Sequence, residues 1–256
     1  MERMEVYAPE KMIYLTDKRQ DLYFEQVFRC ARKTKLVKPE TELVHIGFGT
    51  VNGKDGRAFK TREGGVMRLE TLISDINEEM YRKIKASREV DDEEARQTAK
   101  IIALSAIKYG DLSNQASKDY IFDIDKFTSF EGDTGPYILY TIVRIKSILN
   151  KYTAQGGDLS NVSLQEVTNE SEKALVMEMA KFNTMMENAF DEVAPHKVCA
   201  YIYDLANAFN KFYHETRILA EEDETKKAGY IALLVLCRDI LEACIDVLGF
   251  EAPERM

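Results

Sequence analysis

The stretch VHIGFGTVNGKDGRAFKTREGGVMRL, from Val44 to Leu69, is the part of the sequence around which the rest is organised. It begins with apolar residues and continues into a glycine-rich, cationic loop. Its glycines are Gly47, Gly49, Gly53, Gly56, Gly64 and Gly65, and its cations are Lys54, Arg57, Lys60, Arg62 and Arg68. An apolar strand that runs into such a loop suits a group that closes on phosphate charge and later releases it. A phosphate-binding loop and a solvated basic turn fit this composition equally well.

Two common phosphate-binding motifs do not fit this loop. The dinucleotide-binding fingerprint would need a third glycine at the position of Asn52. A P-loop that ends at Lys54 would need a glycine in place of Phe48 and a serine or threonine in place of Asp55. The sequence therefore favours neither of these two folds.

Short motifs in the loop and beyond it follow one another in a fixed order. They are Phe48-Gly49, Gly53-Lys54-Asp55-Gly56, Phe59-Lys60-Thr61-Arg62, Gly64-Gly65, Arg68-Leu69, Ser129-Phe130-Glu131-Gly132, Thr134-Gly135-Pro136-Tyr137 and the ending Glu251-Ala252-Pro253-Glu254-Arg255-Met256. The first five resemble the second signature loop of arginyl-tRNA synthetases, and the last resembles the C-terminus of that family. Because the motifs span nearly the whole chain in order, chance similarity is a poor explanation.

The overall charge limits the possible partners. The chain has 256 residues, of which 44 are Asp or Glu and 35 are Lys or Arg, for a formal net charge of −9. A nonspecific nucleic-acid binder is normally basic, so we expect no DNA partner, whereas a selective RNA binder with local cationic faces remains compatible. No stretch approaches the roughly 20 apolar residues of a membrane span, and the charged N-terminus has no signal peptide pattern. We therefore expect a cytoplasmic protein without a membrane partner.

Metal binding and paired-carboxylate chemistry are not indicated. The four cysteines form no Cys-x-x-Cys pair, and the three histidines are scattered. Cys237 and Cys244 are seven residues apart on an expected helix, so they share a face that we predict to be buried. Asp123 and Asp125 lack a third ligand at suitable spacing, which favours a structural turn. We predict no protein-bound metal.

The N-terminal part reads as a strand followed by a helix. Lys11 to Leu15 is predicted as the strand, and the helix is expected to begin at Thr16 and Asp17, with Gln20 completing a capping box. In an open α/β sheet, ligands bind at the carboxyl ends of the strands. Gln20 thus has two interpretations. It is either the reciprocal cap of its own helix or, as the resemblance implies, the glutamine that contacts the guanidinium of the substrate arginine.

A second strand is predicted from Glu42 to Val51, and it leads into the cationic loop. His45-Ile46-Gly47-Phe48 is similar to the first class I synthetase signature, His-Ile-Gly-His, but its fourth residue differs and it stands too close to the second loop. We therefore interpret His45 as a strand residue beside a nucleotide pocket rather than as a catalytic group. The resemblance implies that ATP binds at His45, Gly47, Phe48 and Gly49, where glycines would let backbone approach adenine closely.

The second signature of the family, Lys-Met-Ser-Lys-Ser, aligns with Ala58 to Arg62. Its first lysine is therefore absent, and the resemblance implies that another lysine compensates. Lys54 and Lys60 are the candidates for stabilising charge on the α-phosphate as pyrophosphate leaves. Arg57 and Arg62 are candidates for contacts with phosphate or tRNA, and Arg62 is assigned to the ATP site.

The remainder is predicted to be helical. Expected helices cover Met67–Tyr81, Asp91–Lys108 with an end at Gly110, Tyr137–Leu149, Glu170–Val193, Pro195–Leu219 and Ala228–Leu248. For the second of these we predict an apolar face formed by Ile101, Leu104 and Ile107, with Ser105 outside it. The helix from Tyr137 is clearly amphipathic, because Ile138, Ile142, Ile145 and Leu149 recur at helical spacing.

The polar side of this helix invites two interpretations of equal weight. Tyrosines next to an arginine suit base stacking and phosphate contact, but tyrosines half-buried against a neighbouring helix are just as common. The resemblance implies an anticodon-binding role. The tRNA-binding residues that it implies are Tyr137, Tyr140, Arg144, Asn210, Tyr213 and Met256.

Together these features predict a mainly α fold with a small α/β part. The resemblance implies the end of a Rossmann-like catalytic domain with its signature loop at residues 1–66, a helical stem-contact connection at 67–134 and an α-helical anticodon-binding bundle at 135–256. The parent would be an arginine-tRNA ligase that uses arginine, its tRNA and ATP with Mg²⁺. The upstream signature would lie before residue 1, so we expect this chain alone to be inactive. The alternative is a non-catalytic helical RNA- or protein-binding scaffold derived from a synthetase.

Overall fold

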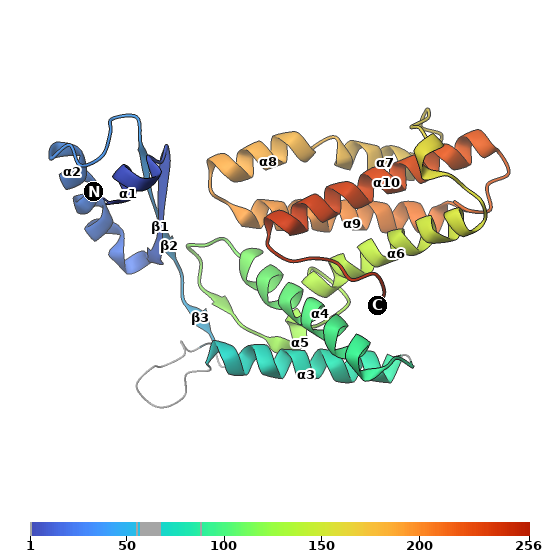
Figure 1. Ribbon diagram of the computed structural model, residues 1–256, viewed down its shortest axis with the longest axis horizontal. Coiled ribbons are helices and arrows are strands. Elements are labelled where there is room, and N and C mark those ends of the chain that lie inside the picture. The colour runs from blue at the N-terminus through green and yellow to red at the C-terminus, as the bar shows by residue number, and fades with distance from the viewer. Residues whose placement is uncertain (1, 55, 57–67, 88) are drawn as a thin grey trace. The chain divides into compact units, whose positions relative to one another are not determined.

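A computed structural model describes residues 2–54, 56, 68–87 and 89–256. Within these residues the chain is mainly helical and has two small parallel sheets, and it forms two compact units (Figure 1). The first unit comprises Met1–Val66 and Asn114–Phe122, and the second comprises Met67–Ser113 and Asp123–Met256. Among the described residues, none of the helices has the length and apolar character needed to cross a membrane.

The first unit is a small α/β assembly. Its elements are α1 (Glu2–Tyr7), β1 (Lys11–Asp17), η1 (Lys18–Gln20), α2 (Asp21–Lys33), β2 (Glu42–Phe48), β3 (Val51–Asn52) and β4 (Tyr120–Ile121). Strands β1 and β2 pair in parallel from Lys11 opposite Glu42 to Asp17 opposite Phe48, and β3 pairs in parallel with β4. The predicted second strand is thus interrupted after Phe48, where Gly49 donates its backbone N–H to Ala116 instead of continuing the ladder.

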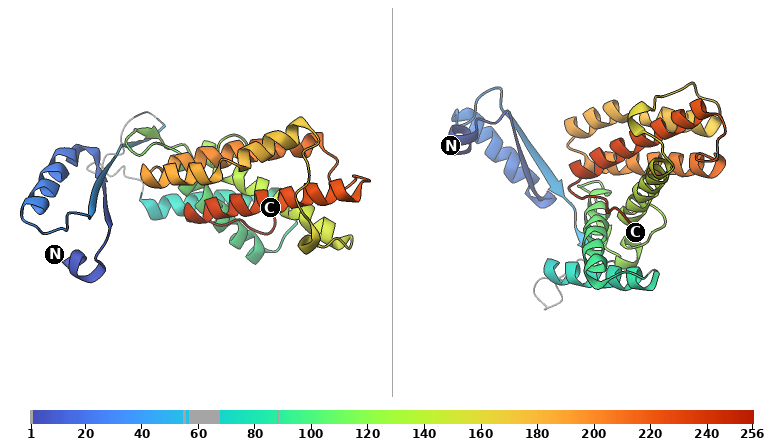
Figure 2. Two further views of the ribbon diagram at one scale, coloured as in Figure 1. Left: turned by 90° about the horizontal axis from the view of Figure 1, so that it is seen from above. Right: turned by 45° about the vertical axis from the view of Figure 1, so that its right-hand side comes forward.

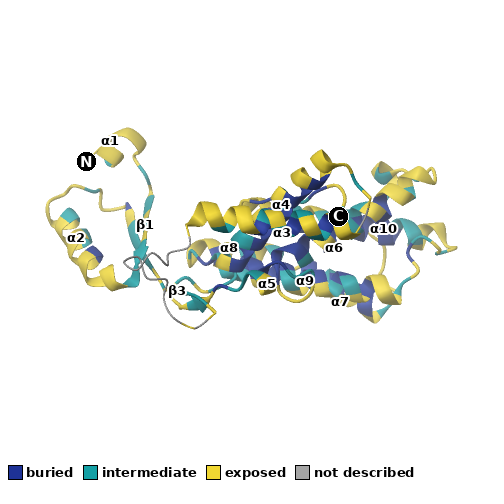
Figure 3. Ribbon diagram, turned by 90° about the horizontal axis from the view of Figure 1, so that it is seen from below, coloured by how far each residue is buried: buried dark blue, intermediate teal, exposed yellow. Residues whose placement is uncertain are grey.

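The core of this unit is aromatic and small. Phe24 is its one buried side chain on α2, with 8% exposure, and its ring lies 5.3 Å from that of Tyr14 on β1. Large apolar side chains at Leu15 and Leu22 are instead 62% and 66% exposed. Figure 3 shows that α1 and α2 are largely exposed along their length.

The second unit contains the remaining helices. They are α3 (Leu69–Ser87), α4 (Asp92–Leu112), α5 (Ile124–Phe127), α6 (Gly135–Ala154), η2 (Leu159–Asn161), α7 (Glu170–Met179), α8 (Phe182–Asp191), α9 (Pro195–Glu215) and α10 (Glu224–Val247). Helix α9 packs along α7, α8 and α10, while α6 packs on α4 and α10 (Figures 1 and 2). The long helix predicted from Glu170 to Val193 is in fact two helices, which meet at Ala180 and Lys181.

The apolar stripes of the bundle helices are buried as their spacing predicts. On α6, Ile138, Ile142 and Ile145 are all 0% exposed. Leu205 and Phe209 on α9 are equally buried, and Figure 3 shows such residues gathered inside the helical unit. Each stripe removes a continuous apolar surface from water, at roughly 25 cal/mol per Å² of buried area. The predicted mainly α fold with a small α/β part is confirmed.

The cysteine prediction is confirmed as well. Cys237 and Cys244 on α10 are both 0% exposed, and burial raises the pKa of both thiols. Thiols in such surroundings stay protonated and unreactive, so these two cysteines fill the core.

Helix α4 differs from its predicted pattern. It continues past Gly110 to Leu112, and Leu104, predicted to be on the apolar face, is 43% exposed. Ser105, predicted to lie outside that face, is fully buried, and its hydroxyl donates to the backbone carbonyl of Ile102 at 2.7 Å. Gly110 is not a helix end: a Cβ there would lie 2.5 Å from the ring of Phe127. Small residues on this face of α4 therefore allow neighbouring elements, such as α5 with Phe127, to pack close to the helix.

Two helices make an especially close approach at the start of α6. Thr134 caps this helix by accepting from the backbone N–H of Tyr137. A Cβ added at Gly135 would lie 2.3 Å from the carbonyl oxygen of Ser105 on α4. Because that neighbour is backbone in the middle of a helix, it cannot move aside as a side chain could.

We expect Gly135→Ala to destabilise the chain by about 1–3 kcal/mol, because the added methyl forces α6 away from α4. Urea denaturation followed by circular dichroism measures this change. Asn150→Ala, at an exposed position of the same helix, is the control and should shift the free energy of unfolding by less than about 0.5 kcal/mol. Equal stability of both variants would contradict the close-approach argument.

Candidate functional site

A cluster of aromatic and polar side chains lies on α6 and α9. The Arg144 guanidinium lies over two tyrosine rings, with its central carbon 4.7 Å from the ring centre of Tyr140 and 5.1 Å from that of Tyr213. Its Nη1 donates to the side-chain oxygen of Asn210 at 2.6 Å. Tyr140 and Tyr213 are 42% and 37% exposed. The arginine is therefore fixed in position while the aromatic surface around it reaches solvent.

Tyr137 anchors the other end of this cluster. Its hydroxyl donates to the side-chain oxygen of Asn207 at 2.7 Å and accepts from the Asn210 amide at 2.9 Å. The same amide lies 3.3 Å from the hydroxyl of Thr141, which is fully buried. Burial raises the pKa of Tyr137, although the Asn210 hydrogen bond opposes the shift. Tyr137 thus stays neutral and acts as both donor and acceptor.

The structural interpretation applies to Tyr137, whereas the base-stacking interpretation of the other tyrosines stays a prediction. Tyr137 is half-buried and bonded to α9, as the structural interpretation expects, and its ring lies 5.8 Å from that of Tyr203. Tyr140 and Tyr213 present exposed rings beside a cation, which is the arrangement that binds unstacked bases. Five of the six predicted tRNA-contact residues therefore belong to one connected cluster.

The sixth residue, Met256, is brought next to Tyr140 by the C-terminal tail. Helix α10 is followed by Gly249, whose φ of +80° turns the chain away from the helix. The next residue, Phe250, is only 5% exposed, so its side chain packs the C-terminal tail onto the helices. Met256 and Tyr140 line one cavity of about 240 Å³, together with side chains from α3 and α4 and with Phe130. All six predicted residues thus lie on the first half of α6 or on segments that adjoin it.

Lys146 holds this tail, and sequence reasoning missed it. Its ammonium group lies 2.8 Å from a carboxylate oxygen of Glu254 and 3.0 Å from one of Glu242. Burial alone would lower the pKa of Lys146, but its hydrogen bonds to Glu254 and Glu242 outweigh that effect and raise the pKa. The only sequence signal was a lysine next to the apolar stripe of α6, which is too common a pattern to single out.

We expect Lys146→Met to loosen the tail by about 1 kcal/mol, a modest value because Glu254 is 78% exposed and water competes for it. Hydrogen exchange of the tail amides should become roughly fivefold faster, while exchange in the α6 core stays unchanged. Lys151→Met, at an exposed position of the same helix, is the matched control. Unchanged tail exchange in Lys146→Met would show that apolar packing alone holds the tail.

A second group of predicted residues gathers at the carboxyl ends of β1 and β2. Asp17 ends β1 opposite Phe48 at the end of β2, and the short turn η1 follows it. The side-chain hydrogen bond from Arg19 lowers the pKa of Asp17 to about 2, so this carboxylate is charged at neutral pH. Asp17 accepts from Arg19 and not from Gln20. Gln20 is exposed, and its side chain makes no cap hydrogen bond to α2, so the capping-box interpretation is wrong.

The His45 side chain makes three contacts within the first unit. Its Nε2 lies 2.8 Å from the hydroxyl of Thr16, and its Nδ1 lies 3.1 Å from a carboxylate oxygen of Asp21. Its ring stacks on Phe24 at 4.5 Å with an interplanar angle of 7°. These contacts fix the orientation of the His45 ring on strand β2.

The glycines near the end of β2 are required by the packing of the chain itself. A Cβ at Gly47 would lie 2.7 Å from the Cα of Lys18, and one at Gly49 would lie 2.3 Å from the carbonyl oxygen of Lys118. The close approach predicted for a nucleotide is thus made here by protein backbone. Phe48 between them is 44% exposed.

The cations of the loop are only partly within the described residues. Lys54 follows β3 and has an electrostatic or hydrogen-bond partner. Lys60 and Arg62, predicted for catalysis and ATP binding, lie outside the described residues, as does Arg57. Asp123, where the sequence favoured a structural turn, caps helix α5 by accepting from the backbone N–H groups of Asp125 and Lys126. Across the described ranges, no group of three or more potential ligands could hold a metal ion.

Comparison with protein families matches almost the whole chain. Residues 1–124 match the family model of the class I (R) tRNA synthetase catalytic domain, and residues 138–256 match that of the DALR anticodon binding domain. The parallel strands of the first unit and the helical bundle of the second unit agree with this pair. Fold and matches together define a class I aminoacyl-tRNA synthetase chain with an anticodon-binding domain.

Individual relatives narrow the class. The arginine–tRNA ligase of Agathobacter rectalis is 63% identical over 262 residues, which cover 99% of this chain and 44% of that protein. The ligase of Alkaliphilus oremlandii is 51% identical, with 100% and 43% covered. The crystal structure of arginyl-tRNA synthetase from Plasmodium falciparum matches with a TM-score of 0.84 at 28% identity, with 99% and 43% covered. The chain belongs to the arginyl-tRNA synthetase family, and it spans less than half the length of these relatives.

Proposed function

We propose that this chain is part of an arginine-tRNA ligase and that it supplies anticodon recognition together with a share of the ATP and arginine sites. In the proposed reaction, the carboxylate of arginine attacks the α-phosphate of ATP to form an adenylate and release pyrophosphate. A ribose hydroxyl of the 3′ adenosine of the tRNA then takes the arginyl group and releases AMP. The observation that carries the proposal is the connected cluster of Tyr137, Tyr140, Arg144, Asn210 and Tyr213. We also propose a cytoplasmic location, with neither DNA nor membrane as a partner.

The chemistry of the cluster suits an unpaired anticodon base. Such a base offers a π-face to Tyr140 or Tyr213, and each stacked base contributes about 1–3 kcal/mol. Arg144 supplies positive charge to a neighbouring phosphate while Asn210 keeps its guanidinium in place. Met256 lines the adjacent cavity and would complete the apolar wall against a base. The net charge of −9 over the whole chain disfavours nonspecific RNA contacts.

The strand-end group would serve the activation step. We propose that Gln20 accepts hydrogen bonds from the guanidinium of arginine, and that exposed Phe48 lies against adenine beside His45, Gly47 and Gly49. The role of Gln20 is supported by its exposed side-chain amide, which makes no cap hydrogen bond to α2. Lys54 or Lys60 would stabilise the charge that develops on the α-phosphate, and Arg62 would bind phosphate. Mg²⁺ would enter with ATP rather than in a protein site.

The domain boundaries follow the same proposal. We propose the end of the catalytic domain at residues 1–66, a connecting region at 67–134 and the anticodon-binding bundle at 135–256. The family-model match that begins at residue 138 supports a boundary near the start of α6, although the helices on both sides of it pack into one compact unit.

We expect this chain to bind arginine tRNA and to lose about 1–3 kcal/mol of binding free energy for each altered anticodon base. Arg144→Gln should lose a similar amount, because it removes the charge and the two ring contacts. Titration of labelled tRNA at fixed salt concentration measures both effects. The control is Arg238→Gln, since Arg238 is a partly exposed arginine on α10 that pairs with Asp239.

Two outcomes would contradict anticodon recognition by this chain. Equal affinity for the native and the altered tRNA would favour a scaffold that binds RNA without reading it. Absence of binding to either would favour a protein-binding scaffold, or recognition that requires the rest of the ligase. An unchanged affinity in Arg144→Gln would remove the cluster from the interface.

We expect the purified chain to show no arginylation of tRNA, because it covers only 44% of a relative's length. The measurement is incorporation of labelled arginine into tRNA with ATP and Mg²⁺ present. The full-length relative from Agathobacter rectalis, assayed beside it, is the positive control. A rate above that of the buffer blank would show that these 256 residues suffice for both steps.

A further inference from the structure

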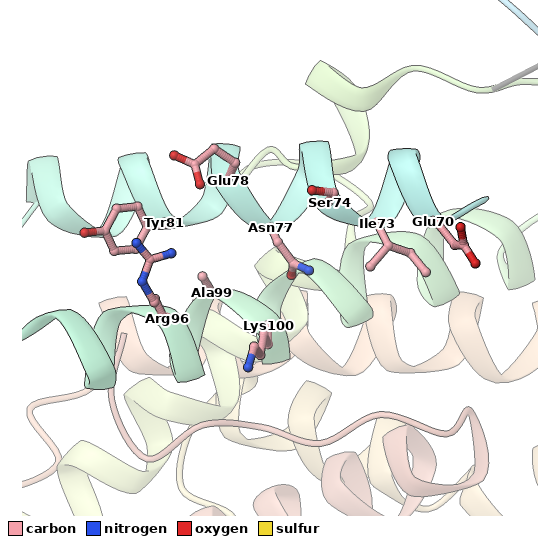
Figure 4. A pocket seen from close by; sticks show the side chains of 9 residues that line it. All are labelled: Glu70, Ile73, Ser74, Asn77, Glu78, Tyr81, Arg96, Ala99 and Lys100. Carbon is pink, nitrogen blue, oxygen red and sulfur yellow. The ribbon is translucent and has the colours of Figure 1, made fainter. Parts of the chain in front are cut away.

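A second pocket lies between α3 and α4, and none of its lining residues belongs to the aromatic and polar cluster on α6 and α9. It has a volume of about 330 Å³, and its lining includes Ile73, Asn77, Tyr81, Arg96, Ala99 and Lys100 (Figure 4). Ala99 is 2% exposed, and its small side chain leaves the space open between the helices. Ile73 is 39% exposed, so the pocket reaches solvent at that end. This volume is at the lower limit of small-molecule sites.

Asn77 brings a buried acceptor to this pocket. Its Oδ1 is shielded from solvent and has no hydrogen-bond partner within the described ranges of the chain. Nearly all buried side-chain acceptors in folded proteins have a partner, so an orphan of this kind needs an explanation. Figure 4 shows the amide projecting from α3 toward α4. A ligand with an N–H donor would satisfy this oxygen.

Tyr81 and Arg96 form a stacking platform at one end of the pocket. The central carbon of the Arg96 guanidinium lies 4.5 Å from the centre of the Tyr81 ring. The Tyr81 hydroxyl donates to a carboxylate oxygen of Asp92 at 3.2 Å, which orients the ring. The guanidinium has a second face that the tyrosine does not cover. Planar guanidinium groups of this kind stack on nucleic-acid bases.

The charges of the pocket are balanced. Arg96 and Lys100 contribute two cations, while Glu70 and Glu78 contribute two carboxylates. A simple anion would be repelled by the carboxylates, and a simple cation by the basic groups. A ligand with a polar planar ring, hydroxyl groups and one phosphate suits such a pocket, because the phosphate can pair with a basic group while N–H or O–H donors can bind to a carboxylate.

We propose that this pocket binds one adenine nucleotide. The adenine amino group donates to Oδ1 of Asn77, because asparagine pairs with adenine through its amide in a bidentate manner. The base stacks on Arg96, and the phosphate pairs with Lys100. The nucleotide comes either free, as a monophosphate, or as an unstacked adenosine of a bound RNA. Only the RNA source rests on the proposed function.

The test uses the full chain with AMP as the free probe and arginine tRNA as the RNA probe. Asn77→Leu removes the amide at similar volume, and Arg96→Gln removes the platform. Each should weaken binding of the relevant probe by about tenfold or more. The unfolding temperature of Asn77→Leu should be equal to or above that of the unmodified chain, because an unpaired buried acceptor has been removed. Lys173→Ala, at an exposed position on α7, is the charge control.

Phe48→Ala separates this pocket from the nucleotide site proposed at the strand ends. AMP binding that falls in Asn77→Leu but not in Phe48→Ala supports the pocket with a free nucleotide. Absence of AMP binding, together with weaker tRNA binding in Asn77→Leu, supports the pocket with an RNA nucleotide. Loss of tRNA binding in Arg144→Gln without any effect of Asn77→Leu on either probe would overturn the pocket while leaving the proposed function intact.

Two further results would also overturn the pocket. One is AMP binding that responds only to Phe48→Ala. The other is a marked fall in the unfolding temperature of Asn77→Leu, which would make the amide a structural group. Conversely, AMP binding that depends on Asn77 in a chain that fails to bind tRNA would support the pocket and contradict the proposed function.

Discussion

Burial of the apolar stripe of α6 is the constraint on which the second unit depends. Because Ile138, Ile142 and Ile145 are wholly removed from water, the helix can present its opposite side in only one orientation. That side carries Tyr137 and Arg144, which then face α9. Rotation of α6 by one residue position would expose an isoleucine and bury a charged guanidinium, and both changes are unfavourable. The core of the helical unit therefore determines the position of the polar cluster.

Sequence periodicity predicted this helix well and predicted α4 poorly, for a physical reason. On α6 the buried residues are large and apolar, so the period of 3.6 is visible in the sequence. The buried face of α4 includes Ala106 and Gly110 as well as Ser105, which a hydrophobicity pattern does not mark. Close approach by Phe127 and by the first turn of α6 makes these small residues necessary. Side-chain size, which depends on the neighbour, cannot be read from one helix alone.

The residues of the candidate site were predictable to a similar, partial degree. The resemblance pointed to cluster residues on both α6 and α9. The hydrogen bonds that connect Arg144 to Asn210 and Asn210 to Tyr137 could not be predicted, because they depend on packing between distant segments. Lys146 carried no motif and was missed. At the strand ends, Asp17 and Gln20 had the spacing of a capping box, yet β1 extends to Asp17 and the helix begins only at Asp21. Asp17 instead caps the short turn η1, because its carboxylate accepts from the backbone N–H of Arg19.

The hydrogen bonds within the cluster also bear on how it can bind. Asn210 bonds simultaneously to Arg144 and Tyr137, so both side chains are ordered before any partner arrives. Ordering a long arginine side chain on binding would otherwise oppose association by about 0.5–1.5 kcal/mol. The exposed rings of Tyr140 and Tyr213 have few rotatable bonds and need little further ordering. Under the proposed function, a rigid polar network beneath an exposed aromatic surface would favour discrimination by shape, since such a surface does not readily adapt to a base of another size.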